Sequence, residues 1–384
     1  MTVMADWFGL REGRTDFQLE TYEDREHLFA RTELNEDILK KLNAAFRTGR
    51  PPKLVLFGDW GVGKTHTLRH IEYIISEKNE YNGIVVFLEL PDVLSKSTFQ
   101  IAHAGLLDAL GFETVKQWMY GFQVKYQADA QNQIKKFAQS EDIANALMGL
   151  LTTGNISRMY WDWLRGLKLS SADAQNIGLS PNLDQSSQLV TVLKTLGHIY
   201  FEVSENLLVL MLDECTKIRE VTNQDSMVHW KNAFKLLSDR ENRHVGLICT
   251  VSINDPDDFP DPLADQQIRT RFSENNLIAL PRFNEEETRA FLTAVLNNVI
   301  DPEKRAALIS KYGSESDGET VSEDTFPFTK DAFDEFIDMT QRFGQATPRD
   351  TLELLDDMLN RAIDEELHIV ASSRLDQLTP DVSG

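Results

Sequence analysis

Residues 53–70 read KLVLFGDWGVGKTHTLRH and decide the fold of this 384-residue chain. The short apolar run at 53–57 predicts a strand, and the apolar residues that follow Lys64 recur at helical spacing. Between the two lies the pattern G-x-x-x-x-G-K-[ST], which runs from Gly58 to Thr65. In a strand–loop–helix of this kind, main-chain N–H groups and the helix start face phosphate oxygens. The stretch therefore predicts a phosphate-binding loop.

This loop predicts a site for ATP and Mg²⁺. Lys64 would neutralise the β- and γ-phosphates, and the Thr65 hydroxyl would bind the metal. The Asp59 side chain must point away from the phosphates because its charge opposes theirs. The residues expected to contact the nucleotide are Gly58, Asp59, Trp60, Gly61, Val62, Gly63, Lys64, Thr65 and His66.

A second acidic element is needed, because a phosphate-binding loop works with an acid that holds Mg²⁺ and a group that activates water. The apolar run LLVLMLDE at 207–214 supplies both. Asp213 is the expected metal ligand together with Thr65, and Glu214 is expected to polarise the attacking water. Two acids beside a triphosphate repel it unless a cation intervenes, which again implies Mg²⁺.

Further strands and helices alternate along the chain, an order that predicts an α/β fold with a parallel sheet flanked by helices. Besides the first strand, strands are expected at 83–90, 206–214, 244–253 and 275–280, and helices at 32–49 and about 225–240. The expected division is a nucleotide-binding core at 1–282, with a helical insertion at about 95–205, and a helical lid with a short tail at 283–384.

The order of these motifs resembles that of the AAA+ P-loop ATPases over roughly residues 25–367. Within them it is most similar to the group of origin-recognition, helicase-loader and transposition-regulator ATPases. The resemblance implies ATP hydrolysis and assembly into a homo-oligomer. The loop GDWGVGKTH departs from most AAA+ proteins, which have Pro and Thr among these glycines.

The same resemblance nominates three further catalytic residues. VSIND at 251–255 is similar to a sensor 1 segment, which implies Asn254 as the polar sensor, with Ser252 as the alternative. QQIRTRF precedes an expected short strand, which implies Arg271 as an arginine finger, with Arg269 as the alternative. PRDTLELLDDML resembles a sensor 2 helix and implies that Arg349 reaches the γ-phosphate from the lid.

Two stretches of the insertion leave their use open. YWDWLRGLKLSSADAQNIGLS is similar, mainly at 163–166, to a segment of ATPases from BREX-type phage-defence systems. QWMYGFQVKYQADAQNQIKKF interleaves aromatic residues with lysines. Such residues either stack on bases and meet phosphates or form the core of a helical subdomain with solvated lysines outside.

The net charge of −22 argues against a protein that coats DNA phosphates. From Lys311 onward there are 18 Asp/Glu against 6 Lys/Arg, so any DNA contact is expected away from the acidic lid. The N-terminus has no apolar signal core and no run of 18 apolar residues occurs, which predicts a cytoplasmic protein without a membrane partner. Cys215 and Cys249 lie in or beside apolar runs and are expected to be buried thiols, with a redox pair as the alternative.

Three functions remain open. In the first, ATP assembles subunits that regulate or recruit a partner enzyme, a nuclease, transposase or helicase, on DNA or away from it, in phage defence or mobile-element control. In the second, the chain is a nucleotide-gated signalling switch without nucleic acid. In the third, it is a replication initiator or helicase loader. The acidic C-terminal part and the short stretch after the last expected helix argue against direct origin binding.

Overall fold

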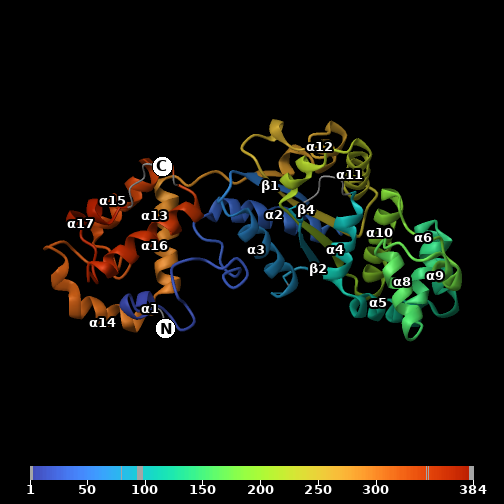
Figure 1. The fold of residues 1–384 in the computed structure, drawn as a ribbon, viewed down its shortest axis with the longest axis horizontal. Helices are drawn as coiled ribbons and strands as arrows, with labels where there is room; N and C mark the ends of the chain where they lie inside the picture. The colour runs from blue at the N-terminus through green and yellow to red at the C-terminus, as the bar shows by residue number, and fades with distance from the viewer. Residues whose placement is uncertain (1–2, 79, 93–97, 343, 345, 380–384) are drawn as a thin grey trace. The chain divides into compact units, whose positions relative to one another are not determined.

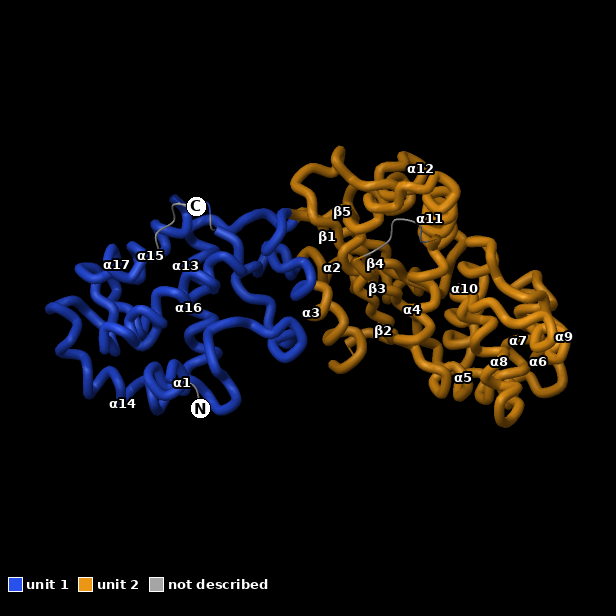
Figure 2. The backbone as a smooth tube through the Cα atoms, in the orientation of Figure 1, with its two compact units in different colours: residues 1–36, 59–67, 280–384 blue, residues 37–58, 68–279 orange. Residues whose placement is uncertain are grey.

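The structure, a computed structural model, describes residues 3–78, 80–92, 98–342, 344 and 346–379. The chain forms two compact units, shown in different colours in Figure 2. Unit 1 consists of residues 1–36, 59–67 and 280–384, and unit 2 consists of residues 37–58 and 68–279. The start of the expected insertion, residues 95–97, and the end of the tail, residues 380–384, lie outside the described residues.

Unit 2 is built on a five-stranded parallel sheet, which confirms the predicted α/β architecture (Figure 1). The strand order is β2-β3-β4-β1-β5. β3 is buried at every position, as expected of a parallel strand covered on both faces. The strands are β1 (Lys53–Gly58), β2 (Gly83–Glu89), β3 (Leu207–Asp213), β4 (Val245–Ser252) and β5 (Leu277–Ala279).

β5 is shorter than the strand predicted at 275–280. It pairs only with β1 and forms one edge of the sheet. The polar residues Glu274–Asn276 form a 3₁₀ turn instead of continuing the strand. Short polar turns of this kind limit the length of an edge strand.

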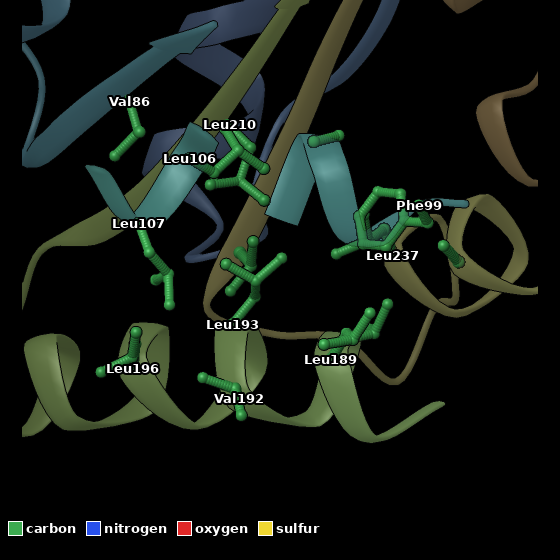
Figure 3. Packing of buried hydrophobic residues seen from close by; sticks show 14 of the residues in the cluster. Val86, Phe99, Leu106, Leu107, Leu189, Val192, Leu193, Leu196, Leu210 and Leu237 are labelled. Atoms are coloured by element: carbon green, nitrogen blue, oxygen red, sulfur yellow. The ribbon is translucent and has the colours of Figure 1, made fainter. Parts of the chain in front are cut away.

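Helices cover the sheet of unit 2 and make up most of the insertion. Figure 3 shows Leu193 of α10 pointing toward Leu210 of β3, beside Leu107 of α4. These contacts join the insertion and the sheet in one hydrophobic core. The helices that lie wholly or mainly in unit 2 are α2 (Thr32–Arg47), α3 (Lys64–Ser76), α4 (Gln100–Leu110), α5 (Phe112–Tyr126), α6 (Ala130–Ala138), α7 (Glu141–Gly149), α8 (Asn155–Leu164), α9 (Ser171–Ile177), α10 (Ser186–Ser204), α11 (Gln224–Leu237) and α12 (Gln266–Phe272).

The aromatic residues that alternate with lysines in the insertion mainly form its core. Trp118 and Phe122 are buried in the hydrophobic cluster. Lys125 forms an ion pair with Glu202 at 2.8 Å, so its positive charge is compensated by a carboxylate of the protein itself. Tyr120 and Phe137 are the exceptions, with 65% and 37% of their surfaces exposed. The arrangement favours a helical subdomain over a platform for bases.

The stretch that is similar to phage-defence ATPases also has a packing role here. Trp163 is fully buried, and its indole N–H donates to the Ser180 carbonyl at 2.8 Å. Arg165 at the end of α8 forms an ion pair with Asp108 at 2.6 Å. Gly166 has a φ of 78°, a left-handed conformation that favours glycine. Packing therefore accounts for these residues.

Unit 1 is helical and has its own hydrophobic core. Phe8 and Phe17 from the N-terminal segment pack in the same cluster as the C-terminal helices. Residues 372–378, expected within a short tail, form α17, and Leu375 and Leu378 are buried. No helix in the described part of either unit combines the length and apolar character needed to cross a membrane. The helices are α1 (Val3–Trp7), α13 (Glu285–Val299), α14 (Pro302–Tyr312), α15 (Lys330–Arg342), α16 (Pro348–Asp364) and α17 (Ser372–Leu378).

Candidate nucleotide-binding site

The glycine-rich stretch forms a loop between a strand and a helix. β1 ends at Gly58, and α3 begins at Lys64. Gly61 and Gly63 have φ values of 80° and 90°, where side chains other than hydrogen are strained. The Lys64 ammonium donates to the main-chain carbonyl of Asp59 at 2.7 Å, so it closes over the loop. The chain has a P-loop α/β fold.

Comparisons with known proteins give only distant structural similarity. No family model and no curated protein matches the sequence. The chain is similar to the ORC1 protein of Aeropyrum pernix in complex with DNA, at 12% identity and a TM-score of 0.46, covering 92% of this chain and 65% of that chain. It is similar to Cdc6p from Pyrobaculum aerophilum, at 11% identity and a TM-score of 0.47, covering 95% and 68%. It is also similar to Drosophila ORC bound to DNA, at 12% identity and a TM-score of 0.49, covering 97% of this chain and 70% of that chain.

This chain therefore spans just under two thirds of the Aeropyrum ORC1 chain, at 65% of its length. At such low identities, and with TM-scores under 0.5, the likeness carries no argument about function. The ligands of those proteins are therefore not assigned to this chain. The residues of the present site must carry the functional argument.

A buried arginine holds the loop in place from within unit 1. Arg31 is 5% exposed, and its Nη2 donates to the Val62 carbonyl at 3.1 Å and to the Pro281 carbonyl at 2.7 Å. Burial lowers the pKa of this guanidinium to about 10. Arg31 therefore fixes the middle of the loop to the segment that precedes α13. The sequence pattern did not single it out.

The negative charge of Asp59, the acidic residue of the loop, is compensated by an arginine. Arg282 donates from Nε to Oδ2 of Asp59 at 3.1 Å, and the Trp60 N–H donates to Oδ1 at 2.8 Å. These hydrogen bonds, first that of Arg282, hold the pKa of Asp59 below its ordinary value. The charge that would oppose a phosphate is thus bound by a cation.

The structure also brings Arg349 to the loop. Its guanidinium lies 3.9 Å from the centre of the Trp60 ring, and its main-chain N–H points to the Gly61 carbonyl at 3.4 Å. Thr347 caps the start of α16 and lies close to Gly61, because a Cβ at Gly61 would approach the Thr347 hydroxyl to 2.9 Å. The proposed sensor 2 residue therefore contacts the P-loop through an exposed tryptophan.

His66, at the third position of α3, contacts the N-terminal segment of unit 1. Its Nε2 lies 2.7 Å from the main-chain carbonyl of His27. Burial lowers the pKa of His66. Its ring is thus engaged with protein, and a nucleotide contact through His66 remains a prediction.

In unit 2, the two predicted acids follow each other at the end of β3. Asp213 is 1% exposed, and the buried Thr250 hydroxyl of β4 donates to its Oδ1. The Glu214 N–H donates to the Thr250 hydroxyl at 2.9 Å and to the Asp213 carboxylate at 3.0 Å. Glu214 has a φ of 58°, a conformation that costs about 1–3 kcal/mol for a residue other than glycine. The two hydrogen bonds support this turn and fix the direction in which Glu214 leaves the strand.

The polar sensor candidates lie at and beyond the end of β4. Ser252 pairs with Gly58 in the sheet, and its main-chain N–H donates to the Thr216 hydroxyl at 2.6 Å. The Ser252 hydroxyl is buried and has no hydrogen-bond partner among the described residues. Asn254 is exposed and lies two residues beyond the strand. Ser252 is thus the candidate held in the sheet beside the start of the loop.

Arg271 lies near the amino-terminal ends of the strands, whereas Asp213 lies at the carboxyl end of β3. It borders a cavity together with Lys53, the first residue of β1, and forms an ion pair with Asp239 at 3.0 Å. A six-residue strand separates its two ends by roughly 17 Å. Arg269, the alternative, forms an ion pair with Asp257 at 3.2 Å. Within unit 2, then, neither arginine is grouped with the acids.

The residue types predicted as Mg²⁺ ligands are oxygen donors. The expected ligands are the Thr65 hydroxyl and the Asp213 carboxylate, and such hard oxygen donors are those that Mg²⁺ prefers. In nucleotide sites Mg²⁺ takes only one or two protein ligands and completes its shell with phosphate oxygens and water. The Thr250 hydrogen bond orients one carboxylate oxygen of Asp213.

Proposed function

We propose that this protein is an ATPase of the AAA+ type that binds ATP·Mg²⁺ through residues 58–66 and Asp213. One observation carries the proposal. β4 lies between β1 and β3, pairs its Ser252 with Gly58, and places the Thr250 hydroxyl on Asp213. The start of the phosphate-binding loop and the buried acid therefore both lie at the carboxyl ends of strands in one sheet.

Each group has a distinct part in this proposal. Lys64 and the loop N–H groups bind the phosphates, and Mg²⁺ held by Thr65 and Asp213 would neutralise their charge. Glu214 orients and polarises the attacking water, and its fixed main-chain turn supports that role. Ser252 or Asn254 senses the γ-phosphate. Residues 1–282 act as the nucleotide-binding core and 283–384 as the lid that supplies Arg349.

Arg271 acts on the nucleotide of a neighbouring subunit. Its place at the amino-terminal edge of the sheet, where it borders a cavity with Lys53, supports action in trans. A guanidinium delivered to the transferring phosphoryl group is worth about 10³–10⁵ in rate. ATP would thus favour a homo-oligomer, and this assembly would regulate or recruit a partner enzyme such as a nuclease, transposase or helicase.

The ATPase is tested with Glu214→Gln, which keeps the shape of the side chain and removes its charge. ATP binding is expected to persist, while hydrolysis falls by roughly 10²-fold or more because the general base is lost. The matched control is Glu220→Gln, an exposed acid on the following 3₁₀ turn. Equal turnover in both variants contradicts the assignment.

Action in trans is tested by mixing Arg271→Ala with Lys64→Ala. One variant keeps an intact pocket and the other an intact finger, so hydrolysis is expected to recover partly in the mixture. Absence of recovery, with a specific activity independent of protein concentration, supports a monomeric switch instead. Rates measured with and without double-stranded DNA then separate assembly on DNA from assembly without it.

A further inference from the structure

A cavity of about 1080 Å³ opens at the amino-terminal edge of the sheet in unit 2. It is formed by the end of α2 with the loop that follows, the start of β1, the loop before β4 and the end of α12. All charged residues among its lining are basic: Lys41, Arg50, Lys53, Arg240, Arg243 and Arg271. This concentration of positive charge occurs in a chain with a net charge of −22.

Four of these six cations form no ion pair with a carboxylate among the described residues. Lys41 forms an ion pair with Asp37 at 3.0 Å, and Arg271 forms one with Asp239. Within the described part of the chain, no ion pair with a carboxylate involves the other three arginines, which are exposed: Arg50, Arg240 and Arg243. The cavity therefore holds uncompensated positive charge on separate segments of the fold.

Lys53 lies among these positive charges. Its ammonium donates to the main-chain carbonyl of Ser238 at 2.9 Å. Burial is the main cause that lowers the pKa of Lys53 to about 8; the Asp239 carboxylate opposes this shift, and the positive charges of Arg271, Lys194 and Arg240 add to it. An anion in the cavity would relieve this repulsion.

We propose that the cavity binds a small ligand with two or more consecutive phosphate groups, at a site separate from the P-loop. Its volume lies just above the usual range of small-molecule sites, about 300–1,000 Å³, and leaves room for a ligand with several phosphates. One phosphate would leave most of the cations unpaired, whereas a chain of phosphates reaches several. Guanidinium groups suit this task because their planar fork pairs with phosphate oxygens in bidentate fashion.

The charge of the whole chain favours a small ligand over nucleic acid. A nucleic-acid strand continues past the cavity onto an acidic protein, where repulsion opposes it. A short oligophosphate stays within the cavity, inside a Debye length of about 8–10 Å of the cations. The site goes beyond the proposed ATPase and shares only Arg271 with its machinery.

The test uses Lys64→Ala, which removes the main cation of the P-loop, and inorganic tripolyphosphate as the probe without Mg²⁺. Calorimetry is expected to show saturable binding. Adding Arg50→Gln and Arg243→Gln is expected to weaken it by about tenfold or more, about 1.4 kcal/mol. The control adds Lys136→Gln and Lys168→Gln, two exposed lysines elsewhere, and is expected to leave binding unchanged.

Three outcomes overturn the proposal: no binding of tripolyphosphate, equal loss in the control, or tighter binding of a short single-stranded oligonucleotide through the same arginines. The last outcome would assign the cavity to nucleic acid. If the double arginine variant does not fold by circular dichroism, Arg240→Gln alone replaces it and is expected to weaken binding as well. Because the P-loop lysine is absent throughout, failure here leaves the proposed ATPase untouched.

Discussion

The Thr250 hydroxyl donates a hydrogen bond to the Asp213 carboxylate across two neighbouring parallel strands. The same hydroxyl accepts from the Glu214 N–H at 2.9 Å. One buried side chain thus orients the proposed metal ligand and fixes the main chain of the proposed base. Partners that orient a ligand are worth about 10–100-fold in metal affinity or activity.

Thr250→Val is therefore expected to lower ATP hydrolysis by about 10–100-fold and to raise the Mg²⁺ concentration that hydrolysis requires. Valine keeps the shape and removes the donor. Thr250→Ser keeps the hydroxyl and is expected to restore most of the activity and the Mg²⁺ dependence. A Val variant that matches wild type in both readouts would show that Thr250 has only a packing role.

Arg31→Met is expected to lower the free energy of unfolding by about 1–3 kcal/mol, because two main-chain carbonyls, one of them buried, lose their donor. These are the carbonyls of Val62 and Pro281. Urea denaturation measures the change. Arg374→Met, at an exposed position of α17, is the matched control and is expected to be neutral. Equal stability of the two variants would remove Arg31 as the anchor of the loop.

Cys215 and Cys249 are expected to stay unreactive toward an aromatic disulfide reagent until the protein unfolds. Both are fully buried and free. Burial, and then a hydrogen bond with Cys249, raises the pKa of Cys215 well above its ordinary value. Since the thiolate is the reactive form, labelling requires unfolding. Rapid labelling of the native protein, or no free thiol after denaturation without reductant, would favour a redox pair.

The sequence predicted the sheet and the loop because their signals are local. The strand–loop–helix at 53–70 and the apolar run that ends in Asp213 each lie within one segment, and both form as predicted. Thr250 was missed because a threonine in an apolar run looks like any β-branched strand residue. Its role depends on the neighbouring strand.

Long-range partners were missed for the same reason. Arg282 pairs with Asp59 across 223 residues of sequence, and nothing near either residue indicates the contact. Arg31 reaches Pro281 across 250 residues. The sequence required only that the Asp59 charge be kept from the phosphates, and the structure supplies the cation that binds it. The basic cavity likewise gathers residues from four separate segments.

Equilibrium binding of ATP·Mg²⁺ to wild type and to Lys64→Ala tests the central claim most directly. Lys64 supplies the ammonium that closes over the loop, so its removal is expected to weaken ATP binding by about tenfold or more, about 1.4 kcal/mol. Lys168→Ala, an exposed lysine of the insertion, is expected to bind ATP like wild type. Equal ATP affinity of wild type and Lys64→Ala would contradict a nucleotide site at residues 58–66.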